Sequence, residues 1–400
     1  MRILVVHNHY GRYAQGGEAN VMNAEARLLR DHGHQVMKYE RTNAEIYEDG
    51  TIADKLGALR NLTWSERSYR EINKVIQAFK PDVMHVHNYK WLLSPSIFAA
   101  AKDRGVATVH TLHNYWMCAP CAALMRQGVI CEKCLTKGNP AYVLFHRCRK
   151  EGNLLFSLLN YLYFRSIERR NKLADLIDGY IALTPFAKQK YILAGLPPDR
   201  IFVKPNGIAD PLAVDRLVGD GGFALFIGRL SYEKGLQTLL DVWNRFDFPL
   251  QIAGDGPLRD SLKAASPSSV QFIGSLPNEE ALDLLARCTF FVFPSIWYEG
   301  FPLSLLEATA LGKASVATRL GARGELVEDG VTGHLYDPTD SEDLARKLSW
   351  MMNHRVEVRE MGNRARKRYL KKFTPEKNYQ SLMPIYETAR DHSKREKRWI

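Results

Sequence analysis

The sequence predicts an α/β protein built from two doubly wound, Rossmann-like domains. Short runs rich in β-branched residues have the length and composition of buried parallel strands. Helical segments separate these runs, and strands that alternate with helices indicate βαβ units. The alternation occurs twice, before and after a stretch rich in glycine at 204–222. A chain of 400 residues is long enough to bury two separate cores.

The first series of strands lies before residue 205. Its strands are expected at 2–7, 35–39, 83–86, 106–111 and 180–183. A helix is expected over 18–31, because apolar residues recur there at helical spacing. His32 and Gly33 then end the helix, since glycine favours the backbone conformation found just after a helix.

The second series begins after two glycine-containing turns, Lys204-Pro205-Asn206-Gly207 and Gly219-Asp220-Gly221-Gly222. Helices are expected at 236–245 and 279–286. The strands are expected at 223–227, 250–253, 270–273, 290–293 and 314–317.

Composition narrows the class of protein. The net charge of +11 favours anionic partners, but zinc-finger spacing and aromatic RNA-binding motifs are missing, so nucleic acid is the least favoured partner. Residues 1–7 resemble a strand and not a signal peptide, and no run approaches the roughly 18 apolar residues of a spanning helix. Six cysteines do not suggest a secreted disulfide framework. We therefore expect a cytoplasmic protein.

Residues 299–307 are the most informative stretch of the chain. Glu299 precedes a Gly-Phe-Pro turn that opens an apolar helix, and Glu307 falls in the second turn of that helix. Pro302 suits a helix start, and Gly300 lets the backbone approach a ligand. The free N–H groups and the helix dipole form an anion site. The two carboxylates are expected on the order of 10 Å apart, which suits an elongated nucleotide-diphosphate-sugar.

This stretch resembles the E-x7-E signature of the retaining glycosyltransferases of family 4. The loop 228–235 (GRLSYEKG) and the turn 253–257 (AGDGP) resemble two further motifs of that family. Gly16 and Gly17 fall where the family has its glycine loop, and His113 falls where it has an active-site histidine.

The resemblance implies a GT-B fold with two Rossmann-like domains that face a central cleft. Residues 1–205 would bind the acceptor and residues 206–374 the nucleotide-sugar donor. The last helix, 375–400, would cross back onto the first domain. Transfer would retain the anomeric configuration, and we expect a front-face attack, because the family does not place a carboxylate under the anomeric carbon.

Residue types and spacing predict part of the donor site. Arg229 and Lys234 lie in a glycine-flanked loop after a strand, and we expect them to clamp the diphosphate. No Asp-x-Asp metal motif follows a strand, so catalysis should need no metal. By resemblance, the catalytic residues are His113, Glu299, Arg229 and Lys234. The donor-binding residues are Gly16, Gly17, Gly228, Arg229, Lys234, Ile273, Ser275, Glu299, Gly300, Phe301, Pro302, Leu303 and Glu307.

Five cysteines crowd into residues 118–148, with two C-x2-C spacings typical of zinc sites. Similarity to relatives with a cysteine insert favours Cys118, Cys131, Cys134 and Cys148 as ligands of a structural zinc, with Cys121 as the alternate. Buried free cysteines are the other interpretation.

Residues 141–172 combine bulky apolar residues with an excess of basic ones. The segment fits a helix at an anionic membrane surface, or a core-packing helix with solvated charges at its ends. Many similar enzymes act on lipid-linked glycans in bacterial surface polysaccharide synthesis. The leading function is transfer from a UDP- or GDP-sugar to a glycan acceptor that is lipid-linked. The alternatives are a GT-B-like nucleotide-sugar epimerase and a non-catalytic nucleotide- or glycan-binding protein.

Overall fold

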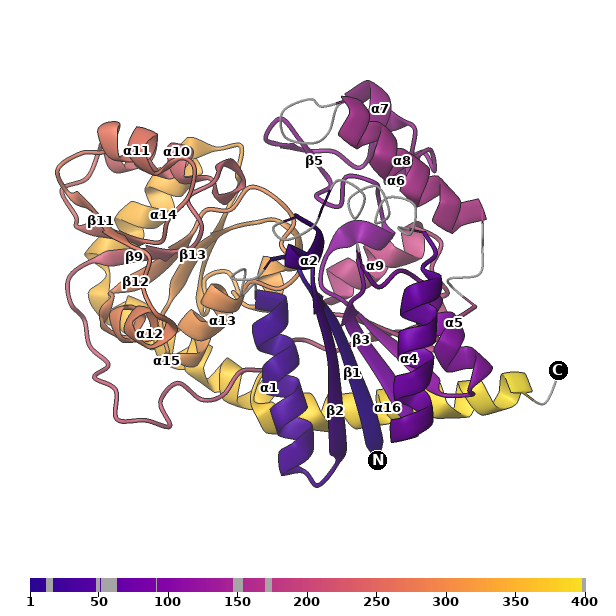
Figure 1. Cartoon of the computed structure of the whole chain (residues 1–400). Helices are drawn as coiled ribbons and strands as arrows, with labels where there is room; N and C mark the ends of the chain where they lie inside the picture. Colours follow the sequence, from indigo (N-terminus) through magenta and orange to yellow (C-terminus); the bar gives the residue numbers. More distant parts are fainter. Residues whose placement is uncertain are drawn as a thin grey trace. The chain divides into compact units, whose positions relative to one another are not determined.

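The computed structural model describes residues 1–11, 17–47, 51, 63–90, 92–146, 154–169 and 175–397. The chain forms two compact units (Figure 1). Unit 1 contains Met1–Ala123, Glu132–Gly207 and Pro375–Ile400, and unit 2 contains Leu124–Cys131 and Ile208–Thr374. The boundary thus falls two residues after the expected position 205, and the short segment Leu124–Cys131 groups with unit 2.

Unit 1 is built on a six-stranded parallel sheet with the order β2-β1-β3-β4-β7-β8. The strands are β1 (Arg2–His9), β2 (Gln35–Thr42), β3 (Val83–Asn88), β4 (Ala107–Leu112), β7 (Gly179–Ala182) and β8 (Ile201–Val203). The five strands that the sequence predicts here are confirmed, and β8 is an addition. β3, β4 and β7 are buried along their full length, as expected for central strands of a parallel sheet, although β3 carries His85, His87 and Asn88.

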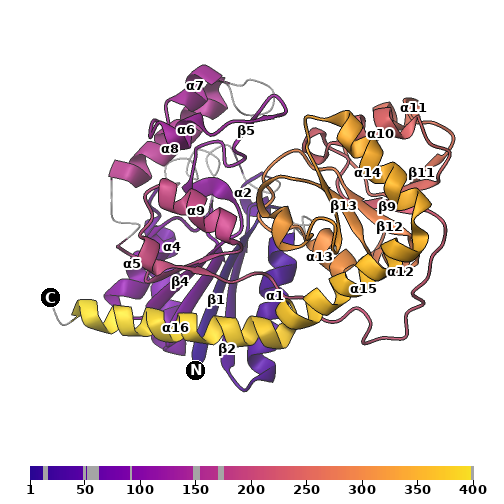
Figure 2. The same ribbon diagram turned by 180° about the vertical axis from the view of Figure 1, so that it is seen from behind.

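The helices of unit 1 connect these strands and cover the sheet. They are α1 (Gly17–Asp31), α2 (Ala44–Tyr47), α4 (Glu66–Phe79), α5 (Ser96–Asp103), α6 (Lys133–Thr136), α7 (Tyr142–His146), α8 (Leu154–Arg169), α9 (Pro185–Leu193) and α16 (Pro375–Lys397), with 3₁₀ turns at Tyr115–Met117 and Pro198–Arg200. Figure 2 shows α16 lying across the strands of unit 1. Its residues Leu382, Ile385, Tyr386 and Ala389 share a core with β1 and β4.

Unit 2 repeats the design with a second parallel sheet, in the order β11-β10-β9-β12-β13-β14. Its strands are β9 (Ala224–Ile227), β10 (Leu250–Ala253), β11 (Val270–Gly274), β12 (Phe290–Phe293), β13 (Ser315–Thr318) and β14 (Gly333–Tyr336). A two-stranded antiparallel hairpin, β5 (Met125–Arg126) and β6 (Val129–Ile130), belongs to the same unit. The five predicted strands are again confirmed, and β14 was not predicted.

The helices of unit 2 are α10 (Leu236–Trp243), α11 (Arg259–Ala264), α12 (Asn278–Arg287), α13 (Leu303–Ala310), α14 (Ser341–Asn353) and α15 (Arg355–Lys372), with 3₁₀ turns at Tyr232–Lys234 and Gly321–Glu325. The core between sheet and helices is apolar and contains the fully buried Trp243. In a parallel sheet the loops at the carboxyl ends of the strands gather at one edge, where ligands bind.

Candidate active site

Three glycine-containing loops meet at the carboxyl edge of the sheet in unit 2. The Gly228 amide donates to the Ala253 carbonyl over 3.0 Å, and the Gly254 amide donates to the Gly274 carbonyl over 2.7 Å. Gly254 has a φ of +139°, and a Cβ atom there would overlap the Gly228 carbonyl oxygen. The AGDGP turn therefore supports the loop that carries Arg229 and Lys234, and it must be glycine where it touches that loop.

The loop 228–235 is also fixed to the end of β12. Gly235 has a φ of +69°, and a Cβ atom there would overlap the Pro294 carbonyl oxygen. The Ile296 amide donates to the Glu233 carbonyl over 2.9 Å, and the Ser295 hydroxyl donates to the same carbonyl over 3.1 Å. These contacts hold Lys234 beside the loop that contains Glu299.

Lys234 and Glu299 form an ion pair, with 2.6 Å between Nζ and Oε1, and both side chains are largely buried. The Ser295 hydroxyl donates to the same Oε1 over 3.0 Å. Burial alone would raise the pKa of Glu299, but the Lys234 and Arg323 cations hold it below its usual value. Glu299 is therefore an anion at neutral pH and already has a cationic partner.

The two cations that the sequence singles out, Arg229 and Lys234, have different surroundings in the structure. Arg229 has an exposed side chain, and no ion pair joins it to a carboxylate within the ranges that the structure covers. Lys234 instead contacts Glu299. Sequence reasoning missed a third cation, the buried Arg323, which donates to the Trp297 carbonyl over 2.7 Å and so supports the loop before Glu299. Arg323 follows β13 in the sequence, and no motif around it indicates a site residue.

The N-terminus of α13 is open. Pro302 occupies the cap position just before the helix, and no side chain caps it. The first helical bond runs from the Leu306 amide to the Pro302 carbonyl over 3.1 Å, so the amides of the preceding residues, Leu303 and Ser304 among them, have no partner inside the helix. Phe301 is buried against Phe373, which anchors the turn. A helix start with free amides of this kind is suited to bind an anion.

Glu307 lies in the second turn of α13, as the sequence predicts, and its side chain is half-buried. Burial raises its pKa to about 7. The other predicted donor residues of unit 2 lie on the loops at this edge. Gly300 is half-buried before α13, Ile273 is half-buried in β11, and Ser275 is exposed just after β11.

In unit 1, His113 directly follows β4 and borders a cavity. His87, from the end of β3, approaches it with 3.0 Å between His87 Nδ1 and His113 Nε2. The other residues that line this cavity are Asn88, Tyr89, Lys90, His110, Thr111, Leu112, Asn114, Trp116, Met117 and Tyr163. His110 is buried and its Nδ1 lies 2.9 Å from the Val86 carbonyl, which agrees with a core residue.

A carboxylate beside this cavity was missed as a site residue. Asn114 donates to Glu18 over 3.1 Å, and Asn88 contacts the other oxygen of Glu18 at 3.5 Å. Burial raises the pKa of Glu18 to about 7. Gly17 is the first residue of α1, whereas Gly16 lies outside the described residues. The sequence placed Glu18 in the first turn of a helix but did not show the two asparagines that bind it.

Comparison with known proteins agrees with this architecture. A model of "Glycosyltransferase Family 4" matches residues 15–210, and a model of "Glycosyl transferases group 1" matches residues 213–368. The chain belongs to the glycosyltransferase family that these two models describe. It is 34% identical over 246 residues to the D-rhamnosyltransferase WbpZ of Pseudomonas aeruginosa, covering 59% of this chain and 64% of that protein.

A second relative of this glycosyltransferase is the O-antigen chain mannosyltransferase C of Escherichia coli, 30% identical over 177 residues, or 43% of this chain and 47% of that protein. The matches span about half to two thirds of these relatives. Among solved structures, Anabaena Alr3699/HepE in complex with UDP has a TM-score of 0.66 at 18% identity, covering 97% of this chain and all of that one. The fold of this glycosyltransferase is therefore GT-B, as predicted.

The cysteines of this glycosyltransferase are only partly described. Cys118, Cys121 and Cys134 are buried and Cys131 is half-buried, while Cys148 lies outside the described residues. Burial raises the pKa of the Cys118 thiol. No three of the cysteines that the structure covers hold their sulfur atoms within 4.8 Å of one another. The four-cysteine zinc site stays a prediction.

Proposed function

We propose that this glycosyltransferase moves a sugar from a nucleotide-diphosphate-sugar to a hydroxyl of a glycan acceptor. The observation that carries the proposal is the carboxyl edge of the sheet in unit 2. There the Lys234–Glu299 pair and the open start of α13 occur together with Glu307. The UDP bound to the structural neighbour HepE supports a nucleotide donor. A thermal-shift comparison of uridine and guanosine nucleotides distinguishes uracil from guanine as the base.

The roles proposed for Glu307, Glu299, residues 273–275 and His113 are those that the family resemblance implies, and they agree with the chemistry of each group. Arg229, Lys234 and the free amides at the start of α13 would stabilise the diphosphate as it leaves, without a metal ion. Glu307 would accept hydrogen bonds from the ribose hydroxyls, and Glu299 would do so from the transferred sugar. Residues 273–275 would hold the base. His113 would contact the sugar near the reacting carbon, and Gly16 and Gly17 would approach the ligand with backbone amides.

The proposed transfer retains the anomeric configuration. The acceptor hydroxyl attacks the face from which the diphosphate leaves, through an oxocarbenium-like state, and the departing phosphate oxygen takes the acceptor proton. Glu299 is already paired with Lys234 and serves in orientation, so it is not the nucleophile in this scheme. Trapping a covalent sugar on Glu299 would overturn this mechanism.

The first test is a thermal-shift panel of uridine and guanosine nucleotides and their sugars, with EDTA present. A ligand that binds only the folded state raises the melting temperature by mass action. We expect one nucleotide family to stabilise the protein and Arg229→Ala to abolish the shift. If no nucleotide stabilises the wild-type protein, the donor site is wrongly assigned. Stabilisation without sugar transfer to any glycan would favour a non-catalytic binding protein.

Nucleotide affinity should depend on pH through Glu307. The ribose hydroxyls donate hydrogen bonds, so only the ionised carboxyl accepts them fully, and its pKa lies at about 7. Affinity should therefore fall as the pH drops below about 7, by up to about ten-fold for each pH unit, and level off above it. Calorimetric titration at several pH values measures this. Glu307→Gln should bind weakly and lose this dependence, and a dependence that survives the substitution would assign it to another group.

We propose further that the acceptor is lipid-linked and that α8 contacts an anionic membrane. This helix buries polar side chains, Ser157 and Asn160, and exposes Leu154, Leu158 and Leu162 at 57%, 38% and 52%. Phe145 on α7 is 80% exposed. The sequence between these helices carries Arg147, Arg149 and Lys150. Exposed apolar side chains next to basic residues fit contact at the membrane surface. No helix in the described part of the chain has the length and apolar composition to cross a membrane.

Vesicle sedimentation tests this contact. Wild-type protein should bind vesicles that contain phosphatidylglycerol more strongly than vesicles of phosphatidylcholine alone. Leu158→Glu with Leu162→Glu should reduce binding at least about ten-fold, because two charges enter the apolar face. Leu370→Glu is the matched control, since Leu370 is a leucine of α15 that is 47% exposed. Equal binding by wild type and the double variant would contradict the membrane assignment.

A further inference from the structure

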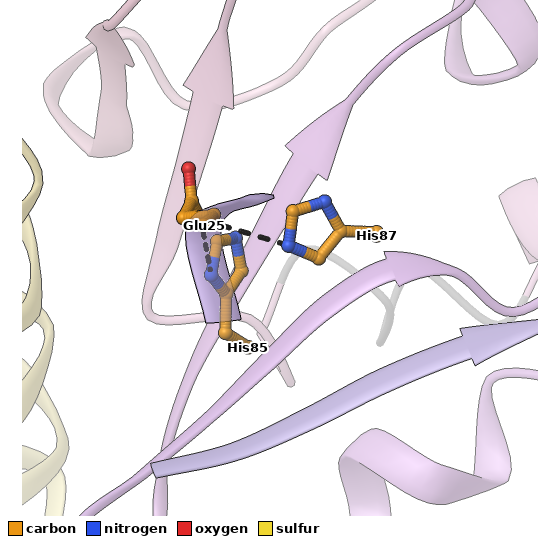
Figure 3. A group of neighbouring side chains, drawn as sticks. All are labelled: Glu25, His85 and His87. Carbon is orange, nitrogen blue, oxygen red and sulfur yellow. Dashed lines mark ion pairs between the residues drawn. The ribbon is translucent and has the colours of Figure 1, made fainter. Parts of the chain in front are cut away.

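Glu25, His85 and His87 form a buried cluster beneath the cavity of unit 1. Glu25 comes from α1 and the two histidines from β3, and Figure 3 shows both rings turned toward the carboxylate. Their exposed fractions are 5%, 0% and 3%. The three ligand-type atoms lie within 4.8 Å of one another, as in a metal site.

The partners of the cluster argue against a metal. Lys204 Nζ lies 2.7 Å from Glu25 Oε2, so a buried cation already neutralises the carboxylate. The ring nitrogens of His85 are both engaged, Nδ1 at 2.8 Å from the Tyr386 hydroxyl and Nε2 at 2.7 Å from the Thr111 hydroxyl. A metal ion would have to displace all these partners.

His87 is the member of the cluster that reaches the candidate active site. Its Nδ1 lies 3.0 Å from His113 Nε2, and the two ring planes are inclined by 22° with 5.2 Å between the ring centroids. Its Nε2 lies 3.6 Å from Glu25 Oε1. Glu25 Oε1 also lies 3.2 Å from His85 Nδ1, whereas the buried His87 Nε2 has no hydrogen-bond partner among the residues described. At 3.6 Å the contact between His87 Nε2 and Glu25 Oε1 is electrostatic, and it is favourable when Nε2 carries the proton.

The direction of the hydrogen bonds follows from Glu25. Burial alone would raise the pKa of Glu25, but Lys204 and the histidines hold it well below its usual value. The charge on this carboxylate therefore favours the His87 tautomer with the proton on Nε2, which leaves Nδ1 to accept a hydrogen bond. His113 must then donate from Nε2. Burial lowers the pKa of His113 to about 3, so the ring is neutral and its Nδ1 keeps a lone pair.

We propose that Glu25 and His87 are positioning residues that fix His113 in the tautomer with the proton on Nε2, so that Nδ1 accepts a hydrogen bond from a sugar hydroxyl. The contact with a sugar rests on the proposed function, whereas the tautomer does not. Lys204 fixes the polarity of this chain of bonds, because it holds the carboxylate in its charged form.

Glu25→Gln provides a sharp test. Lys204 requires an acceptor, so the amide oxygen faces Lys204 and the amide NH₂ faces the histidines. His87 then accepts at Nε2, carries its proton on Nδ1 and donates to His113 Nε2. The proton of His113 moves to Nδ1. Long-range ¹H–¹⁵N correlation spectra of histidine-labelled protein distinguish the two tautomers.

We expect His113 to be protonated on Nε2 in the wild-type protein and on Nδ1 in Glu25→Gln. The wrong tautomer should lower kcat by about 10²- to 10⁴-fold and leave the affinity for the free nucleotide unchanged. His110→Asn is the matched control, because it removes another buried imidazole of the same sheet without touching this chain of bonds. It should leave the His113 tautomer as in the wild type.

A proton on Nδ1 of His113 in the wild type overturns the proposal, as does an unchanged tautomer in folded Glu25→Gln. If Glu25→Gln does not fold, His87→Phe keeps an aromatic ring at this position but removes its nitrogens, and His113 should then show a mixture of tautomers. A single Nε2–H tautomer in His87→Phe would also overturn it. A wild-type protein with the expected tautomer that neither binds nucleotides nor transfers sugar would refute the proposed function alone.

Discussion

Lys234→Met should reduce the rate of sugar transfer by about 10²- to 10³-fold, since fixed cations at a departing charge are worth that much. Lys234 is held by the loop 228–235 and already pairs with Glu299 at 2.6 Å, so its charge is in place before the substrate arrives. The methionine keeps the volume of the side chain and removes only the charge. Turnover of the nucleotide sugar found in the thermal-shift panel is the measurement.

Lys263→Met is the control for this variant, because Lys263 is an exposed lysine on α11 of the same unit. It should transfer sugar at the wild-type rate. Calorimetric titration with the free nucleoside diphosphate separates two causes of the loss, because this ligand has no transferred sugar for Glu299 to contact. If Lys234 stabilises the diphosphate, Lys234→Met should bind the free nucleoside diphosphate more weakly than the wild type, and if the loss comes only from stranding the Glu299 charge, this affinity should be unchanged. A Lys234→Met enzyme within ten-fold of the wild-type rate would refute the clamp.

Lys204→Met should lower the free energy of unfolding of unit 1 by about 3–5 kcal/mol, the cost of removing one partner from a buried ion pair. Lys204 is 1% exposed and its ammonium contacts the equally buried Glu25 at 2.7 Å. In the variant, the Glu25 carboxylate is still buried but no longer has a cationic partner. Chemical denaturation followed by near-ultraviolet circular dichroism measures the difference.

The double variant Lys204→Met with Glu25→Gln removes both charges and should recover most of the lost stability. The pH dependence gives an independent check. The pKa of Glu25 is depressed in the folded state, so its stabilisation is present above the ordinary glutamate pKa and lost as the pH falls through the lower, folded value. The single variant should lose this contribution at higher pH than the wild type. Equal stabilities of wild type and single variant would show that the pair contributes nothing.

The sequence predicts the parts of this fold that depend on local pattern. Ten strands and the helix start after Pro302 follow from apolar runs, glycines and a proline, which act within a few residues. Strands β8 and β14 were not predicted. Both are edge strands. β8 has only three residues, and β14 (GHLY) begins with a glycine and a histidine in place of a continuous apolar run.

The sequence could not predict the contacts of the site that form between residues far apart in the chain. Nothing local to Glu25 indicates that it meets His87 on another element, and both residues fit an ordinary helix and strand. The Lys234–Glu299 pair likewise depends on how two loops are held against each other. For α8, leucines at helical spacing are compatible with a buried or an exposed face. Only the packed structure shows that Ser157 and Asn160 are buried and that Leu154, Leu158 and Leu162 are exposed.

The placement of α16 has a consequence for how the chain is made. This helix completes the core of unit 1 through Leu382, Ile385 and Tyr386, but all of the main segment of unit 2 precedes it in the sequence. During synthesis, unit 2 can therefore emerge from the ribosome in full while the part of the first sheet that α16 covers is still exposed. Synthesis of unit 1 thus begins before that of unit 2 and ends after it. The exposed apolar part of its sheet is the expected binding site for a chaperone on the nascent chain.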